Sequence, residues 1–403
     1  MALVSKAFRG HWLMRRLFVL GVLLLSIGIG MVARAQILAP ILFGGARTTS
    51  YSGPGDIVSG ALAWYGLRGY SGAFAAPGTG KSIALVNQGG AGIACDVVIA
   101  SSGNLGGMAS SCGGHAGQTP QQFAGTDATC TATIASTTMT VSSCSSGTLH
   151  VNDQITGAGI TSPSYIASIG TCASPPGTCT LNAPQTVAVG ETVTATTVLI
   201  VGEWYDQTGG GHDLPFQAGH ISALFFYNCI NNGTTACALS ITGTAYGPAT
   251  ISSLVRPYSF SSVGERTSSF TSFSTFVSTF TDTVGGNIGT GNTSNTIYTY
   301  CNTNSAGSPT ANDNVLHAIQ GVCSTTNSVV NVDGSELTGA TGTGGGSTVI
   351  TIMTNADVSY SSVLQGLFEE GGAWAIAFSS GNRTSMCKNQ QSYYGAGNFG
   401  ATC

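Results

Sequence analysis

Short apolar runs, rather than long amphipathic periods, dominate the hydrophobic pattern of the chain. Segments such as SIALVN at 82–87, TVLIVGEWY at 197–205 and STVITIM at 347–353 are rich in β-branched residues and are separated by Gly, Ser, Asn and Pro. Many short strands separated by such turn-forming residues are typical of a sandwich or jelly roll. The pattern therefore predicts an all-β fold.

Local signals add two helices and a hairpin to this fold. The segments IVSGALAWYGLRGYS at 57–71 and SGNRTSMCKNQQSYYG at 380–395 each predict a short helix, the second with a Ser N-cap and a closing Gly. The segment VNVDGSEL at 330–337 predicts a hairpin, because Asp333 and Gly334 suit the positive φ of a type I′ turn.

The stretch from Thr131 to Val193 differs from its surroundings because it is rich in Thr, Ser and Val, and its flanks nearly repeat as TATI at 131 and TATT at 194. We interpret 131–193 as a small β-module inserted in a surface loop, similar to short β-repeat modules of phage and bacterial surface proteins. The alternative is a long irregular loop. The insertion divides the predicted sandwich into 36–130 and 194–403.

The first 35 residues have the organisation of a signal peptide. Basic residues precede an apolar run, and ARA at 33–35 supplies a small-residue cleavage site. The alternative is an uncleaved anchor, because the run approaches the length of a short spanning helix. Both interpretations place the rest of the chain outside the cytoplasm, secreted or at the cell surface, and after cleavage we expect no membrane contact.

The charge balance excludes one class of partner. Five of the twelve basic residues and none of the sixteen acidic residues lie within 1–35, which leaves seven against sixteen and a formal charge of −9. Nucleic acid is therefore not an expected partner, since phosphate binding needs clustered Lys or Arg. Charged residues make up only 7% of the chain, and a surface of hydroxyls and amides suits a polysaccharide or another glycan.

Twelve cysteines follow the signal segment, and none forms a C-x2-C pair. An even number in an exported chain predicts disulfides rather than a metal site. The short-range pairs Cys172–Cys179, Cys229–Cys237 and Cys387–Cys403 are favoured by their spacing.

Two motifs, SGALAWYGLRGYSGAFAAPGTGKSIALVN at 59–87 and GEWYDQTGGGHDL at 202–214, resemble the catalytic domain of α-L-arabinofuranosidase B, glycoside hydrolase family 54. The C-terminal third, with its V-D-G hairpin and AWAIAF strand, resembles LamG-like jelly rolls. The resemblance implies a concanavalin-like β-sandwich that binds and hydrolyses arabinofuranosyl side chains of polysaccharides. The alternative is a non-catalytic LamG-like adhesion or surface-display protein of the cell-envelope or phage-tail type.

Hydrolysis with retention needs a carboxylate nucleophile and an acid/base carboxyl group about 5–5.5 Å apart. The resemblance implies that Asp357, upstream of QGLFEEG at 365–371, is the acid/base. The region of the family's nucleophile contains no Glu, so Asp282 and Glu370 are only substitutes and the nucleophile is not identified. Glu369 cannot pair with Glu370, because adjacent strand residues point to opposite faces.

The motif at 202–214 also supplies the predicted binding residues. Trp204, Tyr205 and Asp206 are the substrate-binding candidates, since aromatic rings stack on the apolar faces of sugars. No cofactor is required, but Asp206 and Asp213 flank a Gly-rich loop and predict a calcium site. The alternative for this loop is a tight turn in which Asp206 accepts backbone amides.

Overall fold

The computed structural model describes residues 51–87, 93–161, 164–197, 199–216, 224–227, 237–240, 246–266, 274–279, 285–290, 296–301, 305–308, 315–340, 346–354, 364 and 366–403. Residues 1–35, predicted to be a signal peptide, therefore lie outside the described residues and that assignment stays a prediction. No helix within the described ranges is both long and apolar enough to cross a membrane.

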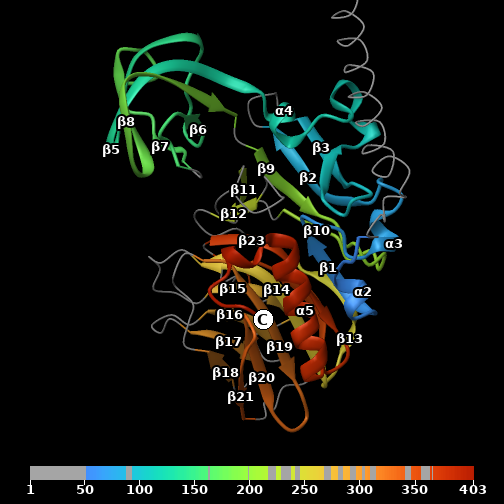
Figure 1. Cartoon of the computed structure of the whole chain (residues 1–403). Helices are drawn as coiled ribbons and strands as arrows, with labels where there is room; N and C mark the ends of the chain where they lie inside the picture. The colour runs from blue at the N-terminus through green and yellow to red at the C-terminus, as the bar shows by residue number, and fades with distance from the viewer. Residues whose placement is uncertain are drawn as a thin grey trace, which may run out of the picture. The chain divides into compact units, whose positions relative to one another are not determined.

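Two antiparallel sheets form a β-sandwich (Figure 1). The larger sheet has the order β21-β20-β19-β14-β23-β12-β11-β9-β2-β3-β4, with β1 beside β23 and β10 beside β9. The smaller sheet has the order β13-β22-β15-β16-β17-β18, and its β15–β18 pack against β14, β19 and β20. This arrangement confirms the predicted all-β sandwich.

The strands of the larger sheet are β1 (Ala61–Gly66), β2 (Lys81–Asn87), β3 (Ile93–Ile99), β4 (Leu105–Met108), β9 (Leu199–Trp204), β10 (Leu214–Pro215), β11 (Leu224–Tyr227), β12 (Cys237–Ser240), β14 (Tyr258–Arg266), β19 (His317–Cys323), β20 (Ser328–Val332), β21 (Ser335–Gly339) and β23 (Gly366–Trp374). Those of the smaller sheet are β13 (Ala249–Leu254), β15 (Ser274–Ser278), β16 (Asn287–Thr290), β17 (Ile297–Tyr300), β18 (Ser305–Ser308) and β22 (Ser347–Ile352).

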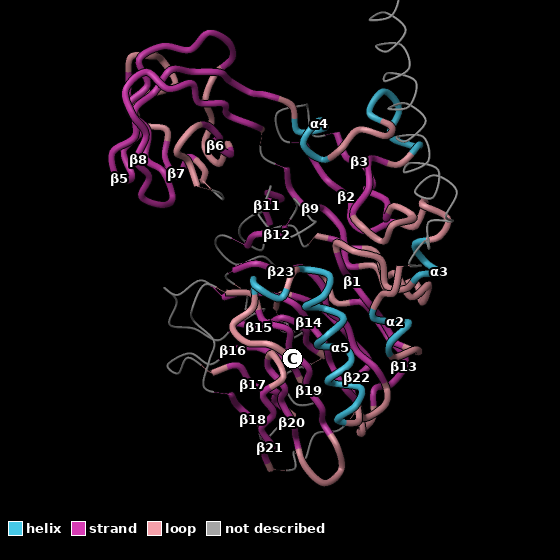
Figure 2. Tube along the Cα trace, in the orientation of Figure 1, coloured by secondary structure: helices cyan, strands magenta, loops and turns pink. Residues whose placement is uncertain are grey.

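The helical elements are short except for the last α-helix. They are α2 (Pro54–Ile57), α3 (Gly72–Ala75), η1 (Ser110–His115), α4 (Pro120–Ala124), α5 (Ser380–Tyr394) and η2 (Ala396–Asn398). The C-terminal helix α5 confirms the sequence prediction: the hydroxyl of Ser379 caps its first turn, and Gly395 ends it with φ of 85°. Figure 2 shows α5 in cyan beside the strands of the sandwich.

The predicted helix over 57–71 is wrong, because its centre forms strand β1. Tyr65 belongs to the main core of the sandwich, whereas Trp64 packs with Trp374 in a second cluster on the opposite face. Apolar neighbours on both faces of the strand explain its continuous apolar run, since a strand buried on both sides shows no polar alternation.

A separate four-stranded sheet consists of β5 (Thr126–Gly147), β6 (Gln154–Gly157), β7 (Ile166–Ser168) and β8 (Gly177–Thr196). It encloses a core of its own, and two disulfides, Cys130–Cys144 and Cys172–Cys179, lie within it. We call residues 126–196 the β-module. Its origin as an insertion over 131–193 stays a prediction.

Disulfides join ten cysteines within the described parts of the chain. Besides the two of the β-module they are Cys95–Cys112, Cys301–Cys323 and Cys387–Cys403. The predicted pairs Cys172–Cys179 and Cys387–Cys403 are confirmed. Cys229 lies outside the described residues, so the third predicted pair stays a prediction. These cross-links are compatible with an exported protein.

The β20–β21 hairpin has the predicted two-residue turn. Asp333 and Gly334 both have positive φ, 49° and 84°, between the paired residues Val332 and Ser335. A Cβ at Gly334 would lie 2.9 Å from the Cα of Cys403. The C-terminal backbone therefore packs directly on the turn.

We expect G334A to reduce the free energy of unfolding more than G60A. Gly60 also has positive φ, but a Cβ there would meet nothing within 4 Å, so its substitution should cost only about 1–2 kcal/mol for the left-handed conformation. G334A adds a backbone clash. Urea unfolding of both variants measures the difference, and equal losses would contradict the packing of the C-terminus on the turn.

Candidate functional site

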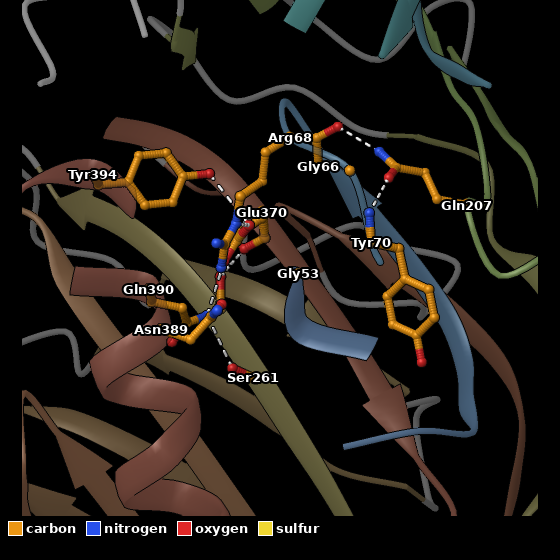
Figure 3. A network of polar contacts seen from close by, with 12 residues as sticks. Gly53, Gly66, Arg68, Tyr70, Gln207, Ser261, Glu370, Asn389, Gln390 and Tyr394 are labelled. Atoms are coloured by element: carbon orange, nitrogen blue, oxygen red, sulfur yellow. Dashed lines mark hydrogen bonds and ion pairs between the residues drawn. The ribbon is translucent and has the colours of Figure 1, made fainter. Parts of the chain in front are cut away.

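Asp206 and Gln207, in the middle of the motif at 202–214, connect the end of β9 to β1. The carboxylate of Asp206 accepts a hydrogen bond from the amide of Trp64 at 3.2 Å, and the amide of Gln207 donates to the carbonyl of Trp64 at 2.9 Å. The side chain of Gln207 donates to the carbonyl of Gly66 and accepts from the amide of Tyr70, each at 2.7 Å (Figure 3). The two motifs that carry the family resemblance thus hold each other in place.

The Gly-rich half of the motif forms a tight turn. Asp206 accepts the amides of Thr208 and His212, while Asp213 accepts the amide of Asp206 at 2.8 Å. Gly209 and Gly211 have φ of 82° and 74°. Backbone donors therefore occupy both carboxylates, and no group of three acidic, His or Cys ligands forms at this turn among the described residues. Calcium at Asp206 and Asp213 stays a prediction.

Trp204 is fully buried and packs edge-to-face on Phe368, with ring centroids 5.3 Å apart. It belongs to the main core of the sandwich. A ring without exposed surface cannot stack on a sugar, so Trp204 is a core residue and not a substrate contact. Of the three predicted binding residues, only Tyr205 presents a partly exposed ring.

Glu370 forms a buried ion pair with Arg68. The Arg68 Nε lies 2.5 Å from Glu370 Oε2 and the Nη2 lies 2.8 Å from Oε1, and neither side chain has exposed surface. Burial acts to lower the pKa of Arg68, but the adjacent Glu370 carboxylate outweighs it and the pKa is raised. This is the paired two-bond geometry that makes arginine–carboxylate contacts strong.

Residues of α5 close the remaining side of this ion pair (Figure 3). Gln390 donates to Glu370 Oε1 at 3.0 Å, and the hydroxyl of Tyr394 lies 3.3 Å from Oε2. The Arg68 guanidinium lies 4.7 Å from the centre of the Tyr393 ring, and burial raises the pKa of both tyrosines. Both phenols therefore stay neutral, and Glu370 is enclosed on the side of the helix.

Glu370, predicted as a substitute nucleophile, lies where a substrate cannot reach it. A nucleophile has to reach the substrate, whereas the Glu370 carboxylate has no exposed surface and both of its oxygens bind other side chains. Its role is structural. Asp357 and Asp282 lie outside the described residues, so their predicted roles in catalysis stay predictions.

We expect E370Q to lower the free energy of unfolding by about 3–5 kcal/mol, because it leaves the buried Arg68 charge without a counter-ion. The matched control is E336Q, which removes the partner of Arg383 where the glutamate side chain is 35% exposed. That change should cost about 1 kcal/mol or less. Chemical unfolding of both variants tests this assignment. A loss in E370Q no larger than in E336Q would refute the structural role.

A second polar group lies on the partly exposed side of the larger sheet, at Lys81, Asp96, Glu203 and Tyr205. The strand order β3-β2-β9 brings them together, since Asp96 and Glu203 both pair with Ala84 and flank it on the same face. We call these four residues the Tyr205 group.

Hydrogen bonds and charges order the Tyr205 group. The hydroxyl of Tyr205 donates to Asp96 at 2.6 Å, and the ammonium of Lys81 lies 2.7 Å from Asp96 and 4.9 Å from the centre of the Tyr205 ring. Burial raises the pKa of Glu203, with a smaller opposing contribution from a hydrogen bond with Tyr205. An aromatic ring, a cation and two carboxylates thus lie together on the solvent-accessible face of the larger sheet.

Sequence reasoning identified Tyr205 but missed its partners. Lys81 begins KSIALVN and Asp96 lies in IACDVVI, where burial alternates and Asp96 falls on the less buried face between Cys95 and Val97. The available signal was one carboxylate in an otherwise apolar strand. Arg68 gave no comparable signal, because its partner is 302 residues away.

A third titratable group lies in the β-module and comprises Asp127, His150 and Asp153. Their ligand atoms all lie within 4.8 Å of one another. Burial is the main cause that raises the pKa of Asp153, to about 7, and the nearby Asp127 carboxylate contributes in the same direction. These three residues form no recognised metal-ligand spacing in the sequence and were not among the predicted site residues.

The sequence matches no family model and no curated protein. Several solved structures show weak similarity. A GH54 α-L-arabinofuranosidase soaked with a cyclic sulfate inhibitor has 13% identity and a TM-score of 0.48, and an arabinofuranosidase complexed with arabinofuranosyl-α-1,2-xylobiose has 12% and 0.46. In each case the match covers 85% of this chain and 65% of the other, just under two thirds of that protein. Such weak similarity concerns the fold and assigns no activity.

Proposed function

We propose that this protein binds arabinofuranosyl side chains of polysaccharides through the Tyr205 group and does not hydrolyse them. The observation that carries the proposal is the position of Tyr205, whose partly exposed ring lies beside Asp96 and Lys81 within the motif that resembles the arabinofuranosidase. Sugars present both hydroxyl groups and apolar C–H faces. The group offers a complementary surface for each.

The chemistry of the group favours a neutral, hydroxyl-bearing ligand. The carboxylates of Asp96 and Glu203 accept hydrogen bonds from hydroxyl groups, and charge-assisted bonds of this kind are stronger than neutral ones. The Tyr205 ring offers an apolar face for stacking. Two carboxylates against one ammonium would repel phosphate, which agrees with the acidic charge of residues 36–403.

Binding without hydrolysis is favoured by the enclosed position of Glu370. A retaining mechanism requires two carboxyl groups facing one cleft, and Glu370 does not supply one. Asp282 is the remaining substitute for the nucleophile, and the family position contains no Glu. Retention of a glycan without turnover is also the behaviour expected of an adhesion or surface-display protein.

Substitution of Tyr205 should weaken glycan binding. We expect Y205A to raise the Kd for arabinan roughly tenfold or more, equivalent to about 1.4 kcal/mol, while Y205F keeps the ring and loses less. Y165A is the matched control, because Tyr165 is another partly exposed tyrosine and lies in the β-module. Isothermal titration measures all four proteins, and unchanged affinity in Y205A would overturn the assignment of the surface.

We expect no release of 4-nitrophenol from 4-nitrophenyl α-L-arabinofuranoside by the intact chain. Turnover that D357N abolishes would show that the protein is a hydrolase, and D282N would then test the nucleophile. Turnover would refute only the absence of hydrolysis. The role of Tyr205 in binding is tested independently by the titrations.

A further inference from the structure

The turn before β6 lies next to the start of β5 in the β-module. Thr126, the first residue of β5, and Gln154, the first of β6, both pair with Thr196 of β8. Asp127 therefore lies at the same end of the sheet as the turn that contains His150 and Asp153. Segments more than twenty residues apart meet at the point where the chain enters and leaves this sheet.

The three side chains converge on one point. The His150 Nδ1 lies 2.6 Å from Asp127 Oδ2 and 3.9 Å from Asp153 Oδ2, and the His150 backbone amide donates to Asp153 at 2.7 Å. The side chain of Asp153 is only 3% exposed, whereas that of His150 is 60% exposed. The group is thus anchored by a buried carboxylate and open to solvent on the side of the imidazole.

The β-module contains no Lys or Arg that could neutralise the two aspartates of this group. Residues 126–196 contain Asp127, Asp153 and Glu191 but no Lys or Arg. The two aspartates approach each other with a single imidazole between them, and among the described residues Asp127 and His150 are the charged neighbours that act on Asp153. Two carboxylates that meet without a Lys or Arg beside them are balanced by protons or by a cation, and a divalent cation would compete with protons for the same ligand atoms.

We infer that Asp127, His150 and Asp153 form a binding site for a first-row divalent cation, with Zn²⁺ as its best match. One imidazole and two carboxylates are a ligand set for such an ion, while Ca²⁺ takes six to eight oxygens. Tetrahedral zinc with bonds of about 2.1 Å places its ligand atoms roughly 3.4 Å apart. The observed 2.6 and 3.9 Å lie on either side of this value, so small side-chain movements would complete the site. A water molecule would take the fourth position of a tetrahedral ion.

A bound ion would link the first strand of the β-module to the turn that precedes its second strand. Asp127 belongs to β5, and Asp153 directly precedes β6. Neither strand pairs directly with the other in the sheet order β5-β8-β6. The ion would therefore add a cross-link that the backbone hydrogen bonds do not provide, independent of the glycan surface at Tyr205.

The test uses the full disulfide-bonded chain, freed of metal with a chelator and titrated with ZnCl₂ by calorimetry. We expect one equivalent to bind, and D127N and H150A to raise the Kd at least tenfold. E191Q is the matched control, because it removes one negative charge from the same module away from the site. Circular dichroism checks that each variant is folded, and thermal unfolding provides a second readout, since Zn²⁺ should raise the Tm of the parent and E191Q proteins but not of H150A.

Three outcomes would overturn the inference. The first is no calorimetric binding at 1 mM ZnCl₂, on the order of the weakest specific affinities. The second is equal weakening in E191Q and D127N, which would indicate general charge attraction. The third is binding of CaCl₂ in preference to ZnCl₂, which would show that His150 is not a ligand.

Discussion

The sandwich depends on a charge that is removed from water. Arg68 follows β1, Glu370 lies in β23, and neither has exposed surface. An isolated charge in that position would be very unfavourable, so each residue requires the other. The pair in turn needs the polar side chains of α5, because a buried carboxylate must have its remaining acceptor capacity filled. Strand β1, strand β23 and the C-terminal helix are therefore one cooperative unit, and a glutamate that looks catalytic in sequence is the centre of that unit.

The motif at 202–214 has two functions on its two sides. Asp206 and Gln207 point inward and form four hydrogen bonds to backbone groups, three with β1 and one with Tyr70 beyond it. Tyr205 lies between the core residue Trp204 and this clamp, and its ring is held at the surface by Asp96 and Lys81. A rigid support of this kind lowers the conformational entropy that a binding residue loses on contact with its ligand. The structural and proposed binding roles of the motif therefore reinforce each other.

Local sequence features predicted local structure well. The Asp333–Gly334 turn, the Ser379-capped helix and two short-range disulfides follow from φ preferences, capping and spacing that act over a few residues. The failures concern long-range packing. Strand β1 resembled a helix because both of its faces are apolar, and Glu370 resembled a catalytic residue because its partner is 302 residues away. The cation site was missed for the same reason, since strand pairing and not sequence spacing brings Asp127 to His150.

The pairing of β1 with β23 joins Ala61 to Trp374 and Gly66 to Glu370. These contacts span more than three hundred residues, and loop closure over such a length must precede the hydrogen bonds that stabilise it. The edge of β23 that receives β1 does not exist until most of the chain is available. Closure of the larger sheet is consequently a late, slow event, and until it occurs β14 and β1 expose unpaired backbone groups. The larger sheet can therefore close only after β23, near the C-terminal end of the chain, has joined both β14 and β1.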